Sequence, residues 1–198
     1  MKSSLLKIIL ALVIVVLAFL IYRSINTPVK FKSELSARGD VVIDKLKDIR
    51  TAEQLYKHLN KRYTASFDTL VQFIRSGKIP VVKIIPDPKD TTFTRTINDT
   101  IGFVSIFDSI YAKKAYKIEE LNLVPYSNGE KFNLLAGQID KGGVKVSVFE
   151  ASAPLEFYSK GLNNQLVINL KKEMEDKNKF PGLKVGSMLD ASTDGNWE

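Results

Sequence analysis

The sequence offers few side chains that could carry out a reaction. It has one histidine, His58, and no cysteine, which excludes a thiolate metal site, a cysteine nucleophile and a multi-histidine metal site. Carboxylate pairs occur at Glu119 and Glu120 and at Asp87 and Asp90. Such pairs can act as general acid and base or bind a hard cation. We expect both pairs to be solvated loop residues and His58 to face solvent on a helix.

No nucleophile elbow, phosphate-binding loop or dinucleotide fingerprint occurs in the sequence, and Gly142 and Gly143 fit a hairpin turn instead. We therefore predict that the protein is not an enzyme and that it has no catalytic, cofactor-binding or metal-binding residues. The function must therefore be sought in the elements of the chain that could place it at a membrane or against a partner.

The composition is that of a globular chain, with 198 residues, 44% of them hydrophobic, and a net charge of +7. Three of the basic residues, Lys2, Lys7 and Arg23, lie in or beside an apolar N-terminal stretch. Outside it, 26 basic residues face 22 acidic ones with no basic block. A nucleic-acid partner is therefore not expected, because it would need a clustered basic surface.

Residues 8–22 read IILALVIVVLAFLIY, and twelve of these fifteen are Leu, Ile, Val or Phe. Extended back to Leu5, the run forms about 27 Å of helix, close to the ~30 Å of a hydrocarbon core. Its insertion is favourable by roughly 4–7 kcal/mol. We predict a membrane anchor at residues 5–23, with Lys7 reaching the headgroups at one end. Its defining residues are Leu5, Lys7, Ile8, Leu12, Val16, Leu20, Tyr22 and Arg23.

A cleaved signal peptide is the alternative interpretation of the same stretch. Cleavage needs small residues at alternating positions after the apolar run, and residues 20–26 contain no such pair. An uncleaved anchor is therefore favoured. The basic residues on the two sides are balanced, but the layout resembles a secretory signal left uncut. We predict a cytoplasmic tail at residues 1–4, a single span of the bacterial inner membrane and a periplasmic C-terminal domain.

The chain after the anchor is predicted to break its helix at residues 26–28, because proline disfavours helix in the residue before it. A second helix then follows from about residue 30 to residue 60, within a juxtamembrane region of residues 24–62. Spacings of three and four give it a continuous apolar stripe, which favours packing on the protein's own domain. A long coiled coil is disfavoured because only Leu46 suits the second seam position. The stripe comprises Val42, Leu46, Ile49, Ala52, Tyr56 and Leu59; the opposite, polar side comprises Asp40, Asp44, Lys47, Asp48 and Lys57.

Residues 63–198 are predicted to form an α+β extracytoplasmic domain. A short helix at residues 68–76 would be capped by Ser66 and ended by Gly77. The strongest β pattern is a hairpin of residues 131–139 and 144–150, in which Val144, Val146 and Val148 form the apolar face. Further strands are expected at residues 79–85 and 101–110, helices at residues 155–160 and 164–177, and a mobile excursion at residues 86–100.

This layout, an apolar helix, an amphipathic continuation and a small β-rich domain, resembles type IV pilins and secretion pseudopilins. The run LKDIRTAE at residues 46–53, followed by Tyr56 and Tyr63, is similar to the end of the pilin helix. The resemblance implies a pilin-like fold, in which the long helix packs on a small antiparallel sheet. The pilin processing site, with its acidic residue inside the apolar run, is absent, so pilin-type assembly is not expected.

The whole chain also resembles an uncharacterised family of single-pass envelope proteins of Bacteroidota-type bacteria, through FDTL at residues 67–70, VFEA at 148–151, PGLKVGS at 181–187 and GNWE at 195–198. This resemblance implies no activity. The sequence therefore predicts a membrane-anchored, non-catalytic structural or interaction protein of the bacterial cell envelope, with a protein partner there. One alternative is an envelope glycan- or peptide-binding domain that uses Phe and Tyr residues of the segment 91–116. Another is a hydrolase whose carboxylates converge from separate segments.

Overall fold

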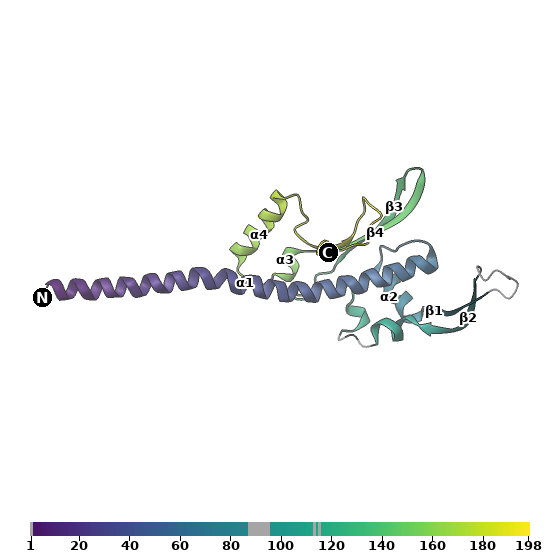
Figure 1. Cartoon of the computed structure of the whole chain (residues 1–198), viewed down its shortest axis with the longest axis horizontal. Helices are drawn as coiled ribbons and strands as arrows, with labels where there is room; N and C mark the ends of the chain where they lie inside the picture. The colour runs from purple at the N-terminus through teal and green to yellow at the C-terminus, as the bar shows by residue number, and fades with distance from the viewer. Residues whose placement is uncertain (1, 87–95, 113, 115) are drawn as a thin grey trace. The chain divides into compact units, whose positions relative to one another are not determined.

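The computed structural model describes residues 2–86, 96–112, 114 and 116–198. The predicted α+β class is confirmed, since a long N-terminal helix packs against small antiparallel sheets and short helices follow it (Figure 1). The chain divides into two compact units, which are described separately. Unit 1 contains residues 2–44, 124–130 and 153–183, and unit 2 contains residues 45–123, 131–152 and 184–198.

Helix α1 (Lys2–Asn60) supplies residues to both units. The predicted break at residues 26–28 is wrong, because α1 continues through Pro28. An internal proline removes one N–H donor and crowds the carbonyl four residues earlier, which is that of Ser24. The adjacent carbonyl of Arg23 accepts a hydrogen bond from the Thr27 hydroxyl at 2.7 Å. Each residue added to a helix on either side of Pro28 gains one backbone hydrogen bond. These bonds together outweigh the single N–H donor that the proline lacks.

The first part of α1 keeps its apolar side chains exposed on every side. From Leu6 to Tyr22 the large apolar side chains are 44–68% exposed, and the most apolar window has a mean hydropathy of 2.8 with none of it buried. One helix is thus long and apolar enough to cross a membrane, a test that a signal sequence also passes. The core helix of a soluble domain would instead be covered by its neighbours.

In unit 1, α1 is fastened to the segment around the short helix α3 (Leu155–Tyr158). The Arg38 guanidinium donates to the carbonyl of Lys160 at 2.7 Å and to that of Tyr158 at 3.3 Å. It also lies 5.1 Å from the ring centroid of Tyr126. Helix α4 (Asn164–Asp176) follows, capped by Asn163. Both helices were predicted, although α3 ends two residues earlier than expected.

In unit 2, the later turns of α1 bury the predicted stripe. Leu46, Ile49 and Ala52 are fully buried, whereas Leu59, the last member of the stripe, is 40% exposed. Helix α2 (Phe67–Ser76) begins as predicted at Ser66, whose side chain accepts a hydrogen bond from the Thr69 N–H. The ring of Phe73, in α2, meets the ring of Tyr56 edge-on, with centroids 5.1 Å apart.

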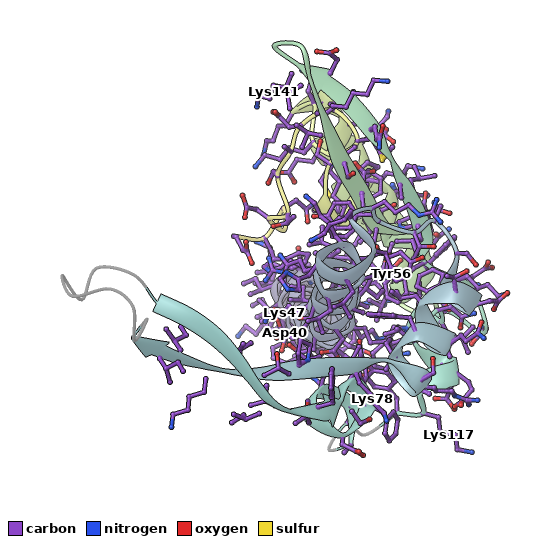
Figure 2. The ribbon with its side chains drawn as sticks, turned by 90° about the vertical axis from the view of Figure 1, so that its right-hand side faces the viewer. Asp40, Lys47, Tyr56, Lys78, Lys117 and Lys141 are labelled. Atoms are coloured by element: carbon purple, nitrogen blue, oxygen red, sulfur yellow. The ribbon has the colours of Figure 1, made fainter. Side chains whose placement is uncertain are left out.

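Most of the three-stranded sheet belongs to unit 2, in the order β3 (Asn133–Lys141), β4 (Val144–Pro154), β5 (Gly182–Gly186). The predicted β3–β4 hairpin is confirmed, and Lys141 lies at its tip (Figure 2). The predicted alternation along β4 is wrong: Val144 is 63% exposed, whereas Phe149, expected on the polar face, is fully buried. Phe149 is covered because the ring of Tyr63 lies over it, with centroids 4.7 Å apart.

A separate two-stranded sheet pairs β1 (Lys78–Pro86) with β2 (Thr96–Ser105). The predicted strand at residues 101–110 is wrong in its second half, where the π-helical turn η1 (Phe107–Tyr111) begins instead. The predicted excursion at residues 86–100 is wrong for its last five residues, which belong to β2 because they pair with β1. Residues 87–95 lie outside the described part of the chain.

The β1–β2 sheet exposes its largest apolar side chains on one face, and Val81 and Val104 of the other face are also exposed. Phe103 pairs with Pro80, and the same face of β1 carries Val82 and Ile84. Phe103 and Ile84 are each 67% exposed. Ile101 forms a bulge where the register shifts, and it is 62% exposed. We call Val82, Ile84, Ile101 and Phe103 the hairpin patch.

Candidate functional site

Asp48 of α1 is the centre of a polar cluster in unit 2. Its carboxylate accepts a hydrogen bond from the Tyr116 hydroxyl at 2.6 Å and lies 2.7 Å from the Lys114 ammonium. Its main-chain carbonyl accepts a hydrogen bond from the Tyr111 hydroxyl at 2.9 Å. The prediction that Asp48 lies on the solvent side of the helix is therefore wrong. It is buried because three groups of a segment more than sixty residues away bond to it.

Lys45 lies one turn before Asp48 and is also buried. Its ammonium donates to the main-chain carbonyls of Glu120 at 2.6 Å and Leu123 at 2.9 Å. It also lies 4.6 Å from the ring centroid of Tyr116, within range of a cation–π contact. Burial lowers the pKa of Lys45, while the charges of Glu120 and Asp48 oppose that shift. The buried cation is thus stabilised by carbonyls, a ring and a nearby carboxylate.

The two tyrosines of this cluster act as hydrogen-bond donors. Burial is the main cause that raises the pKa values of Tyr111 and Tyr116 far above the ordinary value of tyrosine. The negative charge of Asp48 raises both pKa values further. Both hydroxyls therefore stay protonated at physiological pH and donate their hydrogen bonds to Asp48. Their bonds to Asp48 hold η1 and the segment after it on α1.

A cleft of about 490 Å³ opens beside the cluster. Tyr111, Tyr116 and Phe107 supply aromatic surface, and Lys117 is exposed. A second cation, Arg75, forms an ion pair with Glu119. Lys114 is paired with Asp48 and Arg75 with Glu119. Among the described lining residues, Lys117 is therefore the cation that favours an anionic ligand. The lining comprises Arg75, Ser105, Phe107, Tyr111, Ala112, Lys114, Tyr116, Lys117, Ile118 and Glu119.

A buried carboxylate, Glu53, lies elsewhere on α1 and is fully covered. One of its oxygens, Oε2, accepts the N–H of Thr64 at 3.0 Å, while Oε1 has no partner among the described residues. Burial raises the pKa of Glu53 to about 7, and the Thr64 bond opposes this rise. Glu53 holds the turn that follows α1, and the absence of a second partner makes its ionised form costly.

The candidate residues from the sequence are placed as follows. The described side chains of the predicted anchor, from Lys7 to Arg23, all lie exposed on α1. His58 is exposed on α1, as expected. Glu119 is ion-paired and Glu120 is exposed, while Asp87 and Asp90 lie outside the described residues. The described part of the chain has no group of three or more His, Cys, Asp or Glu that could hold a metal ion.

Of the aromatic residues in the segment 91–116, the cleft gathers Phe107, Tyr111 and Tyr116 but not Phe103, which belongs to the hairpin patch. Sequence reasoning did not identify Lys45, Asp48 or Glu53 as buried groups. Their place next to the apolar stripe could have indicated burial. Lys45 and Asp48 each precede a buried residue of the stripe, and Glu53 follows one.

Comparison with known protein families, with curated proteins and with solved structures gave no match. The site is therefore interpreted from its own residues.

Replacing Glu53 tests the effect of its buried charge. Between pH 4.5, its ordinary pKa, and pH 7, the unfolded chain releases this proton while the folded chain keeps it. The free energy of unfolding should therefore fall as pH rises through this window, by about 3 kcal/mol, and level off above pH 7. In Glu53→Gln this contribution should vanish, and at pH 8 the variant should be more stable than wild type by about 2–3 kcal/mol.

The measurement is urea unfolding of the full chain in detergent at pH 5 and pH 8, followed by near-ultraviolet circular dichroism. Asp108→Asn is the matched control, because the Asp108 carboxylate is exposed, and it should keep the wild-type pH dependence. An unchanged pH dependence in Glu53→Gln would contradict the assignment.

Proposed function

We propose that the protein is a membrane-anchored, non-catalytic structural or interaction protein of the bacterial cell envelope, with its folded units on the periplasmic side of the inner membrane. The supporting observation is the unburied apolar helix. Between Leu6 and Tyr22 no residue of α1 is buried, and the large apolar side chains are 44–68% exposed. Exposure of this much apolar surface to water is strongly unfavourable. A bilayer would cover all sides of the helix at once.

Retention of the anchor is supported by the backbone as well as by the sequence. Helix α1 runs without interruption through residues 20–26, the region in which a signal peptide would be cut. The missing small-residue pair and this continuous helix both favour an anchor that stays on the mature chain. The pilin-like or secretion-apparatus role is a finer form of this proposal.

A non-catalytic role is supported by the bonds that the buried charged groups of unit 2 form with other parts of the chain. Asp48 and Lys45 bond to three tyrosine or lysine groups and to two main-chain carbonyls. These groups therefore hold chain segments in place. The partner contact is assigned to the hairpin patch, because large exposed apolar groups of this kind mark protein–protein contacts.

A second candidate function is favoured by the cleft beside Asp48. Its aromatic walls and the exposed cation Lys117 suit an envelope peptide or glycan that carries a carboxylate. In this alternative the anchor holds a binding domain at the membrane, and the cleft carries the specificity.

Two arginines in the middle of the span should release the protein from the membrane. Each charge there costs about 2.5–3.5 kcal/mol, so Leu12→Arg with Val16→Arg should cancel the roughly 4–7 kcal/mol that favours insertion. The measurement is the fraction of the full chain that stays in membranes after carbonate washing. Wild type and the control Val41→Arg, which adds an arginine at an exposed position of α1 beyond the span, should both stay. A wild-type chain that is soluble and begins beyond residue 22 would contradict the anchor.

A photoreactive benzoylphenylalanine at position 103 should capture the partner in intact membranes. We expect one adduct of defined mass, because Phe103 lies in the hairpin patch. The matched control is the same group at position 83, where Lys83 is exposed on the opposite face of β1. Equal capture at both positions, or none at either, would contradict a contact through the patch.

The cleft is tested with a short peptide that has a free C-terminal carboxylate and with its amidated twin. If the cleft binds carboxylates, the full chain in detergent should bind the free acid about tenfold more tightly, since one charge-assisted hydrogen bond separates the two. Lys117→Glu should abolish this preference, while Lys145→Glu, at an exposed position of β4, should keep it. Equal binding of both peptides to the wild-type chain would remove this alternative.

A further inference from the structure

A second cleft, of about 540 Å³, lies within unit 1 where the apolar part of α1 ends. One wall comes from α1 and the other from the start of α4, so residues about 140 positions apart in the sequence share it. The α1 wall comprises Leu20, Arg23, Ser24, Thr27 and Pro28, and the α4 wall comprises Asn163, Gln165 and Leu166.

The position of this cleft along α1 is informative. The apolar run ends at Tyr22 and Arg23 follows it, so in the proposed anchor Leu20 lies in the hydrocarbon edge and Arg23 among the headgroups. The cleft therefore opens at the boundary between acyl chains and headgroups. This step rests on the proposed membrane anchoring.

The polar lining suits a phosphate. Arg23 is exposed and forms no ion pair with any described carboxylate. A guanidinium presents paired donors that match two phosphate oxygens. Ser24 adds a hydroxyl, and the side-chain amide of Asn163 adds a neutral donor. The Gln165 amide already donates one hydrogen bond to Asn169 Oδ1 at 2.9 Å. The Thr27 hydroxyl is already committed as a donor to the Arg23 carbonyl. Among the described residues that line the cleft, one cation stands against no carboxylate.

The α4 wall adds to this positive potential. Helix α4 has thirteen residues and begins at Asn164, with the Asn163 side chain accepting the N–H of Leu166. The positive end of its dipole therefore lies at the cleft. Its position is set by packing, because Val167 of the first turns is buried.

The apolar lining separates a lipid from a free phosphate. Leu20 and Leu166 come from opposite walls, and Pro28 also lines the cleft. Apolar groups beside a phosphate-sized set of donors suit the glycerol and upper acyl chain of a phospholipid. An anionic headgroup fits better than a zwitterionic one, because the cation of a zwitterionic headgroup would meet Arg23 and the positive end of α4.

We propose that this cleft binds the headgroup phosphate of an anionic phospholipid from the membrane that holds α1. The bound lipid would tie α4 to the bilayer surface and neutralise Arg23. Unit 1 then recognises a lipid headgroup at the end of the membrane span.

The test uses the full chain in detergent micelles, titrated with phosphatidylglycerol or phosphatidylcholine, with bound lipids counted by native mass spectrometry. Wild type should bind phosphatidylglycerol about tenfold more tightly than phosphatidylcholine. This factor corresponds to the binding free energy of one charge-assisted hydrogen bond. Arg23→Gln should remove this preference. Lys30→Gln is the matched control, since Lys30 is an exposed cation of α1 outside the lining, and it should keep the preference.

A second variant tests the cleft without changing Arg23. Gln165→Glu places a carboxylate in the α4 wall and should lower phosphatidylglycerol binding by about the same factor. Equal losses in Arg23→Gln and Lys30→Gln would overturn the proposal, because they would indicate general attraction between charges. Displacement of the lipid by millimolar inorganic phosphate would overturn the lipid assignment in favour of free phosphate.

Carbonate washing separates this outcome from failure of the anchor. A wild-type chain that stays in the membrane but shows no lipid preference overturns only the lipid site. A wild-type chain that washes out overturns the membrane anchoring on which the lipid site rests.

Discussion

One constraint governs the rest of the structure: the single helix α1 has side chains suited to two different surroundings along its length. Up to Tyr22, α1 exposes apolar side chains on every side, so any solvent that covers it must be apolar all round. From Val42 onward the same helix buries one side, which includes the stripe and the charged residues Lys45, Asp48 and Glu53, and keeps Asp44 and Lys47 exposed. The backbone hydrogen bonds of α1 continue across this change and across Pro28. Both compact units are therefore built on one continuous element.

Polar groups on α1 then fix where the rest of the chain attaches. In unit 1, Arg38 bonds to two carbonyls near the end of α3. In unit 2, Lys45 and Asp48 hold the segment from Tyr111 to Leu123, and Glu53 holds the turn at Thr64. Apolar contacts are not directional, whereas a buried charge accepts only partners in the right geometry. The irregular segments, which lack strand ladders, are thus aligned by these charged residues.

The sequence predicted the elements whose cause is local. The apolar run, the stripe on α1, the Ser66 cap and the β3–β4 turn each depend on residues a few positions apart, and all are present. The predicted break at Pro28 failed because the helix on both sides outweighs one local donor. Other errors concern distant partners. Asp48 has the type of a surface residue and becomes buried only because Tyr111 and Tyr116 reach it, and Phe149 is covered by Tyr63. Likewise, no local pattern could show which aromatic residues of the segment 91–116 line the cleft.

The two exposed apolar surfaces suit different surroundings. The first part of α1 satisfies its own backbone, so hydrocarbon can cover it. The β1–β2 hairpin cannot enter hydrocarbon in the same way, because no third strand pairs with it in the described chain and both edges keep free N–H and C=O groups. It also carries Lys78 and Lys83, and an isolated pair of strands is only marginally stable in water. A surface that combines exposed apolar side chains with unpaired backbone groups suits a protein rather than hydrocarbon, which agrees with the proposed division between a bilayer around the helix and a protein partner at the hairpin.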